Sequence, residues 1–154
     1  MRKTLMALTL ALVASTASAQ APPPDVMAPI RQFLDGFNKG DVPSALAACA
    51  ASTSIIDEFA PFEWTGPGAC GKWANDYDAD SKKKGITAGA VTMSAPSHWA
   101  VEADRAYVVL PTSYEVTQKG KQVKQTGAVM AVTLQKGSAG WKITAWSWST
   151  GTTR

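Results

Sequence analysis

The sequence is poor in the side chains that bind metals or carry nucleophilic catalysis. It has one histidine, His98, and two cysteines, Cys49 and Cys70, which lie far apart in the chain. A zinc site needs about three or four closely arranged Cys, His or carboxylate ligands, so we expect no metal site. A Ser-His-Asp triad would have to use His98, which we expect at the surface or at a strand edge. The sequence therefore predicts neither a metal nor another cofactor.

Apolar stretches long enough to span a bilayer are also lacking. The apolar stretch Leu5–Val13 is far shorter than the ~20 residues that a membrane helix needs. It follows Arg2 and Lys3 and precedes the small residues Ala17–Ala19. This order is typical of a cleavable secretory signal, which we place at residues 1–19. We expect a periplasmic or secreted protein with no membrane anchor after cleavage.

Charge of either sign is scarce. The chain has 15 Lys and Arg against 12 Asp and Glu, and its net charge of +3 owes two charges to Arg2 and Lys3 of the predicted signal. Proteins that bind nucleic acid through phosphates need a concentrated basic footprint, so we expect no nucleic-acid partner. The run Lys82–Lys84 falls where a helix should end, and cations are favoured there by the helix dipole.

The remaining chain begins with helical patterns. After a short extended lead over residues 20–25, an apolar stripe predicts an amphipathic helix that ends at Gly40. The stripe consists of Val26, Ile30, Phe33, Leu34 and Phe37. Asp41 then caps a second, shorter helix that we expect to continue to Ala51.

Strand patterns dominate from Thr53 onward, interrupted by one helix over Cys70–Lys84. We expect Thr53–Phe59 and Phe62–Thr65 to pair, with Gly66–Gly68 as a turn, followed by an antiparallel meander. The meander strands are Val91–Met93, Trp99–Val101, Ala106–Val116, Lys124–Gln135 and Trp141–Ser149. Helices followed by an antiparallel meander indicate an α+β domain.

Cys49 and Cys70 lie on either side of the predicted hairpin, which brings both to one end of it. A disulfide persists in an oxidising compartment, and a loop of this length would stabilise the fold by about 3 kcal/mol. We expect this disulfide; two buried free thiols are the alternative.

The order of these elements resembles the NTF2-like superfamily, and within it the SnoaL-like and ketosteroid-isomerase-like proteins. The residues that carry the resemblance are Phe33–Asp41, Thr53–Asp57 and Gly140–Ile143, together with Trp146 and Trp148. It implies a cone-shaped NTF2-like (cystatin-like) α+β fold over residues 26–150. In this fold a curved antiparallel sheet wraps around three N-terminal helices.

The resemblance also implies an apolar pocket at the open end of the cone. Trp146 and Trp148 alternate with serines and therefore share one face of the last strand. If that face is concave they line the pocket, and if it is convex they pack under a helix or at a subunit interface. The side chains that we expect to bind a ligand are Phe33, Phe37, Trp64, Tyr114, Met130, Trp146 and Trp148.

Asp57 is the candidate catalytic residue. In ketosteroid-isomerase-like enzymes the general base is an aspartate on this strand, and Asp57 matches its offset from the helix corner at Asp41. A carboxylate in an apolar cavity has a raised pKa, which suits proton abstraction beside a carbonyl. The alternative is a structural Asp57 that starts a turn before Glu58 or binds a backbone amide.

The oxyanion donors of those isomerases are missing here. Phe33 stands where the resemblance places a tyrosine, and no Asp or Glu follows Glu115 to serve as the acid. Loss of one such donor costs about 10²–10³ in rate, so we do not expect a steroid isomerase.

Three functions remain open. The first is binding of a small hydrophobic or amphipathic ligand without strong catalysis. The second is an isomerase, dehydratase or cyclase that uses Asp57 as general acid and base. The third is a non-catalytic interaction module that forms a homodimer through its open sheet face.

Overall fold

The fold is known from a computed structural model that describes residues 21–153. The signal predicted at residues 1–19 lies outside these residues. Two helices open the described chain, a strand pair and a third helix follow, and six further strands complete it. Within residues 21–153, no helix is both long and apolar enough to cross a membrane.

Helix α1 (Pro24–Lys39) carries the predicted apolar stripe and ends at Gly40, whose φ of 68° gives the left-handed conformation. It begins inside the predicted extended lead, because a proline at the first helical position has a suitable fixed φ. Its buried face includes Ile30 and Phe33, which pack toward the sheet.

Helix α2 (Val42–Ala47) begins as predicted, since Asp41 Oδ1 accepts a 3.1 Å hydrogen bond from the Ser44 amide. Its predicted end at Ala51 is wrong. The residues from Cys49 onward belong to the first strand, because they pair with the last long strand of the sheet. Helix α3 (Ala69–Lys84) matches its predicted range to within one residue.

Eight strands form one curved sheet. They are β1 (Cys49–Ile56), β2 (Glu63–Pro67), β3 (Ile86–Met93), β4 (His98–Glu102), β5 (Arg105–Gln118), β6 (Lys121–Gly137), β7 (Gly140–Ser149) and β8 (Thr152–Thr153). The order is β2-β1-β7-β6-β5-β3, with β4 also on β5 and β8 on β6. Strand β2 includes Gly66 and Pro67, which we had expected in a turn.

One strand pair corrects the predicted antiparallel sheet. Strands β1 and β7 run parallel, with Ile55 opposite Trp146, whereas the other pairs are antiparallel. The long connection through α3 and the meander permits this pairing, because parallel strands need a crossover.

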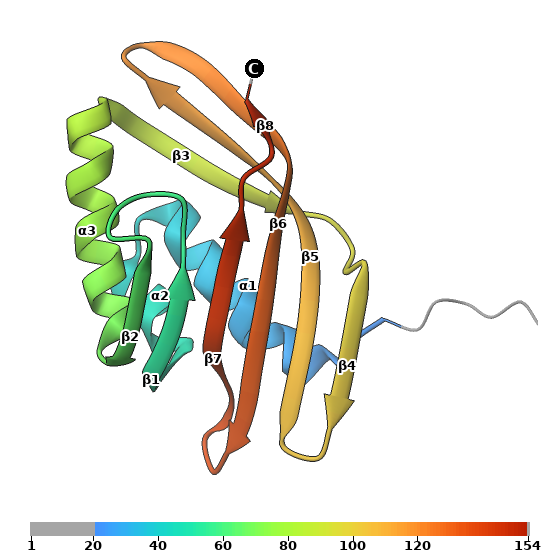
Figure 1. The fold of residues 1–154 in the computed structure, drawn as a ribbon. Coiled ribbons are helices and arrows are strands. Elements are labelled where there is room, and N and C mark those ends of the chain that lie inside the picture. The colour runs from blue at the N-terminus through green and yellow to red at the C-terminus, as the bar shows by residue number, and fades with distance from the viewer. Residues whose placement is uncertain (1–20, 154) are drawn as a thin grey trace, which may run out of the picture.

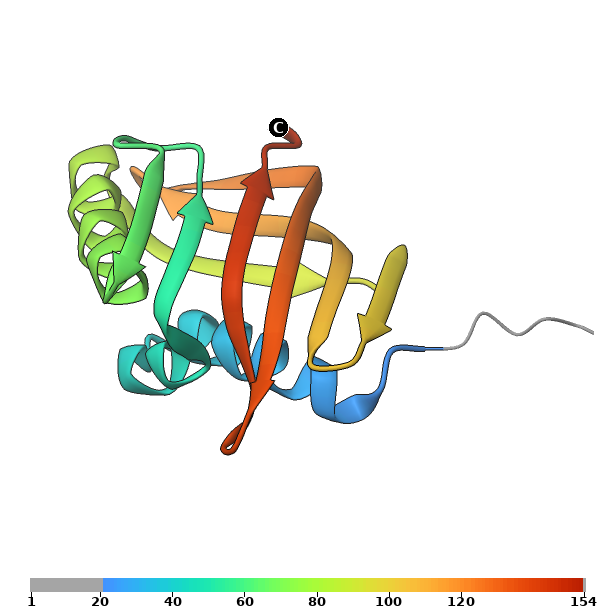
Figure 2. The same ribbon diagram turned by 60° about the horizontal axis from the view of Figure 1, so that its bottom comes forward.

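The sheet wraps around the helices as a cone. Figures 1 and 2 show β3 and the ends of β5 and β6 bending away from the other strands, with α1 against the concave side and α3 beside β2. A bulge at Gly127 (φ 74°) accompanies this bend, since Thr112 and Ser113 of β5 lie opposite Ala128 and Thr126.

A second bulge decides which residues of β7 face the core. Leu134 pairs with Ile143 and Thr133 with Ala145, so Thr144 is the extra residue. The bulge places Ile143 and Trp146 on the same buried side, although simple alternation would separate them.

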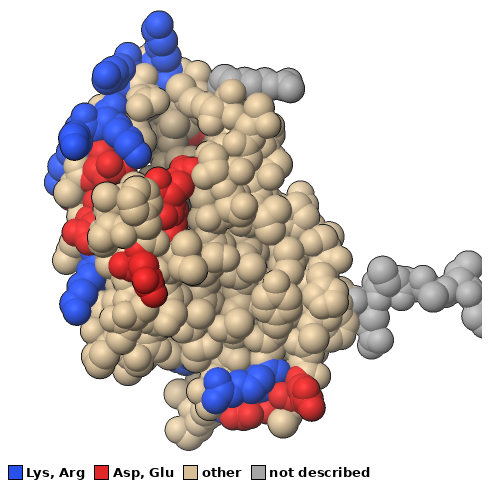
Figure 3. Space-filling view, in the orientation of Figure 1, with Lys and Arg blue, Asp and Glu red and all other residues tan. Residues whose placement is uncertain are grey.

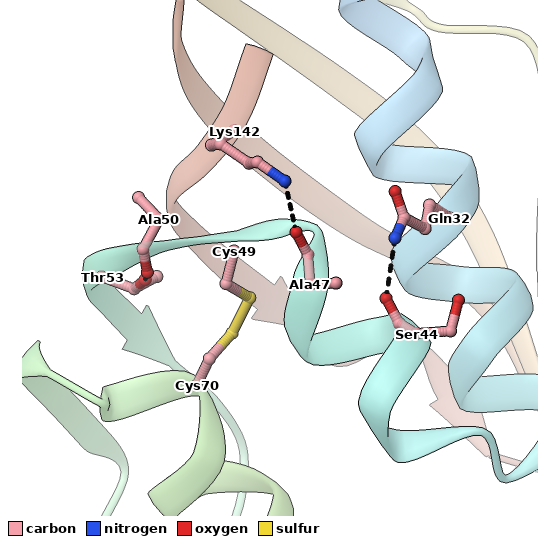
Figure 4. The surroundings of a disulfide bond; sticks show 8 residues. All are labelled: Gln32, Ser44, Ala47, Cys49, Ala50, Thr53, Cys70 and Lys142. Carbon is pink, nitrogen blue, oxygen red and sulfur yellow. Dashed lines mark hydrogen bonds between the residues drawn. A yellow bond between two sulfur atoms is a disulfide. The ribbon is translucent and has the colours of Figure 1, made fainter. Parts of the chain in front are cut away.

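The predicted disulfide between Cys49 and Cys70 is present, with the two Cα atoms 6.6 Å apart. It joins the start of β1 to the first turn of α3 (Figure 4). Helix α2 lies beside it, and Lys142 and Gln32 donate to α2 carbonyls at 2.5 and 3.0 Å.

Candidate functional site

A cavity of about 80 Å³ lies between α1, α3 and the concave face of the sheet. Its walls are largely aromatic, contributed by Phe33, Phe37, Phe59, Trp73, Tyr77, Tyr114, Trp146 and Trp148. Polar groups from Asp57, Glu58, Asp80, Ser81 and Lys84 also reach it. In Figure 3 the surface is hollowed beside α3, with lysines gathered over that helix and carboxylates close by.

Six of the seven predicted ligand-binding residues line this cavity: Phe33, Phe37, Tyr114, Met130, Trp146 and Trp148. The tryptophan-bearing face of β7 is therefore the concave one. Trp64 does not line the cavity. Helix α3 packs against β2 and covers it, and Trp64 Nε1 donates a 2.8 Å hydrogen bond to Asp76 on that helix. Trp64 also contacts Phe59, with ring centroids 5.0 Å apart.

Asp57 lies directly after β1, and its side chain lines the cavity. Its Oδ2 atom accepts a 2.8 Å hydrogen bond from Trp73 Nε1, and Oδ1 accepts a 2.7 Å bond from the Glu58 amide. Burial raises the pKa of Asp57 from 3.8 to about 6, and the two hydrogen bonds only partly oppose this rise. Asp57 thus lines the cavity and also accepts a hydrogen bond from a backbone amide, as the structural alternative expects; its catalytic role stays a prediction.

Two tyrosines that line the cavity are in direct contact. The hydroxyl of Tyr77 on α3 is hydrogen-bonded to that of Tyr114 on β5. Burial raises the pKa of Tyr114 above its ordinary value, so this phenol stays protonated. A bond between two hydroxyls uses one hydrogen, which leaves the other available to donate to a ligand.

Trp73 holds the aromatic wall together. Its ring stacks on Tyr77 with centroids 5.6 Å apart, and it meets Trp146 edge-on at 4.9 Å. Phe33 and Phe37 pack on it at 5.7 and 6.1 Å. Sequence reasoning missed Trp73 and Tyr77, although their i, i+4 spacing places both on one face of α3.

A chain of polar side chains fixes Trp148 in the wall of the cavity. Trp148 Nε1 donates to Gln125 Oε1 at 3.1 Å, and Gln125 Nε2 donates to Glu58 Oε2 at 3.3 Å. The hydroxyl of Thr150 donates to the same Glu58 oxygen. These bonds connect the loop after β1, strand β6 and the chain after β7 around one edge of the site.

Two further predictions concern metal ligands and the position of His98. Residues 21–153 contain no group of three or more His, Cys, Asp or Glu side chains arranged to hold a metal ion. His98 is exposed on β4 next to Tyr107 and does not line the cavity.

Comparison with known proteins identifies the fold. No protein-family model matches the chain, and no curated protein matches its sequence. Solved structures do match. An NTF2-like superfamily protein from Salmonella enterica has a TM-score of 0.68 and 16% identity, over 83% of this chain and 89% of that one.

Two further solved structures are similar over most of their length. A hexachlorocyclohexane dehydrochlorinase from Novosphingobium barchaimii has a TM-score of 0.68 and 12% identity, over 82% of this chain and 87% of that one. A ketosteroid isomerase-like protein from Erwinia carotovora has a TM-score of 0.61 and 17% identity, over 81% and 92%. The chain has the NTF2-like fold, as its sequence predicts. Identities this low establish the fold and not the activity.

Proposed function

We propose that this chain is an exported protein that binds a small apolar or amphipathic ligand in the cone cavity, without strong catalysis. The observation that carries the proposal is an aromatic-walled cavity with a few polar groups, among them the partly buried Asp57. Cavities of this composition are the usual binding sites for small molecules.

The cavity volume of about 80 Å³ suits a small ligand, and we propose a single ring with one substituent. Rings also suit the walls, because aromatic side chains prefer edge-to-face and offset contacts with other rings.

The disulfide supports the exported location. A bridge between Cys49 and Cys70 persists in an oxidising compartment such as the periplasm and is rare in the cytosol. Cleavage after residue 19 is the matching expectation from the sequence.

A blocked cavity tests the proposal. Ile86 is half-buried and lines the cavity, so Ile86→Trp should fill part of the cavity and weaken binding of cyclohexanone at least fivefold in an NMR titration. Ile56 is exposed and lies outside the cavity, so Ile56→Trp should bind like the parent and serves as the control. Equal affinities for the two variants, or no binding to the parent by a panel of small ring compounds, would refute the proposal.

A second candidate function is acid–base catalysis of the isomerase, dehydratase or cyclase kind. It is favoured by Asp57, whose pKa of about 6 suits proton transfer near neutral pH, and by the Tyr77–Tyr114 pair, which offers a hydroxyl donor. These tyrosines would replace the donors that the sequence lacks at Phe33 and on the late strands.

Proton exchange at carbon tests this candidate. An active protein should speed exchange of the α-hydrogens of cyclohexanone for deuterium, and Asp57→Asn should lower that rate by about 10²-fold or more. Asp76→Asn is the control, because Asp76 binds Trp64 outside the cavity. A rate that Asp57→Asn does not change would exclude Asp57 as the base.

A homodimer through the outer sheet face is a third proposal. Figure 3 shows almost no charge over the central strands, and Ile56 and Tyr107 are exposed large apolar residues of this sheet. Ala131 on β6 lies between Val109 and Ser147 of the neighbouring strands, so Ala131→Glu should convert a dimer to a monomer. Light scattering measures the molar mass of each variant. Val42→Glu, which changes an exposed residue of α2, is the control and should keep the oligomeric state of the parent. A monomeric parent protein would exclude the dimer.

A further inference from the structure

Lysines from two separate parts of the chain gather at one corner of the molecule. Helix α3 ends in three of them, and the turn between β5 and β6 brings three more beside that end. The Lys119 amide donates a 2.8 Å hydrogen bond to the Gly85 carbonyl, and Gln118 Nε2 donates to the Lys84 carbonyl at 3.4 Å. Lysines gather over α3 in Figure 3. The lysine corner consists of Lys82, Lys83, Lys84, Lys119, Lys121 and Lys124, all of them exposed.

Only part of the charge of the lysine corner is neutralised within it. Three of its lysines have an acidic partner, in the ion pairs Lys82–Asp78, Lys84–Asp80 and Lys124–Glu115. Within residues 21–153, none of the ion pairs involves Lys83, Lys119 or Lys121. The C-terminal end of a helix carries only about half a negative charge, so the corner keeps an excess of roughly two and a half positive charges.

The rest of the described chain has the opposite charge balance. Residues 21–153 contain twelve Lys and Arg and twelve Asp and Glu, so their formal charges cancel. The lysine corner and its partners account for six of these cations and three of these acids, which leaves a formal net charge of −3 on the remainder. An anionic surface therefore attracts the corner and repels the remainder, so it should hold the molecule in one orientation.

The chemistry of the lysine corner favours a lipid surface over a nucleic acid. Its cations are all lysines, which are flexible point charges and lack the planar fork with which arginine holds a phosphate. Proteins that bind single-stranded nucleic acid also offer aromatic side chains for stacking. The exposed large apolar residues of the described chain all lie outside segments 82–85 and 119–124. A fluid bilayer has mobile anionic headgroups that can gather around such a loose set of lysines.

We propose that the lysine corner docks reversibly on an anionic lipid bilayer. This inference goes beyond the proposed ligand binding and does not require an occupied cavity. Each lysine near such a surface strengthens binding about fivefold, so the three unpaired lysines should contribute about 100-fold together. Lys84 also lines the cavity, so docking holds the cavity close to the bilayer.

Cosedimentation of the mature protein with vesicles tests the inference. In 100 mM salt, vesicles of equal parts phosphatidylglycerol and phosphatidylcholine should bind it about 100-fold more tightly than vesicles of phosphatidylcholine alone. The difference should vanish in 500 mM salt, because salt screens exposed charges. Equal affinity for the two kinds of vesicle in 100 mM salt, or binding to neither, would overturn the inference and would leave the cavity proposal untouched.

A triple variant locates the binding surface. Lys83→Gln, Lys119→Gln and Lys121→Gln together should lower the affinity for the anionic vesicles to nearly that for phosphatidylcholine. These side chains are exposed and form no ion pair within the described residues, so the variant should fold like the parent.

The control variant removes three cations elsewhere. Arg31→Gln, Lys72→Gln and Lys136→Gln change exposed residues of α1, of the start of α3 and of β6. This variant has the same net charge as the first one but should keep most of the parental affinity. Equal affinities of the two triple variants for the anionic vesicles would overturn the inference, because binding would then follow net charge and not the lysine corner.

A DNA duplex distinguishes the bilayer from another polyanion. A short duplex that supplies as many phosphate charges as the accessible phosphatidylglycerol should release less than half of the vesicle-bound protein. The reason is that duplex-binding proteins use more phosphate contacts than three unpaired lysines can make. Release of most of the protein would show that the lysine corner prefers nucleic acid, and it would overturn the inference.

Discussion

The indole nitrogen of Trp73 and a carboxyl oxygen of Asp57 lie 2.8 Å apart, and their hydrogen bond links α3 to the end of β1. Both residues also line the cavity, so this bond ties the placement of the buried acid to the centre of the aromatic wall. Burial nevertheless dominates the electrostatics of Asp57, because its pKa is raised despite the bond.

The raised pKa of Asp57 predicts how stability depends on pH. Between pH 3.8 and about 6 the folded state holds the Asp57 proton more tightly than the unfolded state does. The free energy of unfolding should therefore fall as pH rises through this window, by about 1–3 kcal/mol. Asp57→Asn should remove that part of the fall, as measured by urea unfolding at pH 4 and pH 7.

Asp35→Asn, on the exposed side of α1, provides the control for this experiment and should keep the contribution of Asp57. At pH 7, Asp57→Asn should be about as stable as the parent or more stable, because no charge is buried. A large loss of stability at pH 7 would instead show that the two hydrogen bonds of Asp57 are its main contribution.

The disulfide predicts that Cys49 and Cys70 resist alkylation. Cys49 and Cys70 should not react with iodoacetamide under denaturing, non-reducing conditions, and both should react after reduction. Replacing both by serine should lower the free energy of unfolding by about 3 kcal/mol, as measured by urea titration. Rapid labelling of the oxidised mature protein would contradict the bridge.

Trp64 should contribute to stability and not to ligand binding. Trp64→Phe removes the hydrogen bond to Asp76 but keeps a ring against Phe59, so we expect a loss of about 1–2 kcal/mol in urea unfolding. The affinity for cyclohexanone should stay within about twofold of the parent. A larger change would equal the loss of a net hydrogen bond to the ligand, which Trp64 does not make if it lies outside the site. A marked drop in affinity would show that Trp64 contributes to ligand binding.

The phenol pair predicts an unusual tyrosine titration. The chain has three tyrosines, and burial together with the bond to Tyr77 disfavours the ionised form of Tyr114. Ultraviolet titration should show one tyrosine that ionises only when the protein unfolds at high pH. In Tyr114→Phe that delayed step should be absent. Its persistence in the variant would assign the step to another tyrosine.

Local sequence patterns predicted most of the elements because each pattern follows from burial of one face. The stripe from Val26 to Phe37 gave α1, and β-branched and aromatic alternation gave the long strands β5, β6 and β7. The end of α2 was misplaced because the alanines up to Ala51 favour a helix locally, whereas pairing with β7 draws them into β1.

The errors at the site have non-local causes. Trp64 was assigned to the pocket because nothing in its own segment shows that α3 covers it. Trp73 and Tyr77 were overlooked because most residues of α3 are polar or charged. Its apolar face is therefore too short to give a clear periodic pattern. The side of β7 that carries Trp146 depended on the bulge at Thr144, and a single inserted residue leaves no mark in the alternation of a short strand.

The parallel pairing of β1 with β7 also determines when the cavity can form as the chain is made. Trp146 and Trp148 are near the C-terminal end of the described chain, whereas Asp57 belongs to its first third, so an incomplete chain lacks one wall. Pairing between strands so far apart in the sequence is slow, because a long loop must close first. Under the proposed function, a ligand would recognise only the complete domain, and at a hundred times its Kd it would add about 2.7 kcal/mol to the free energy of unfolding.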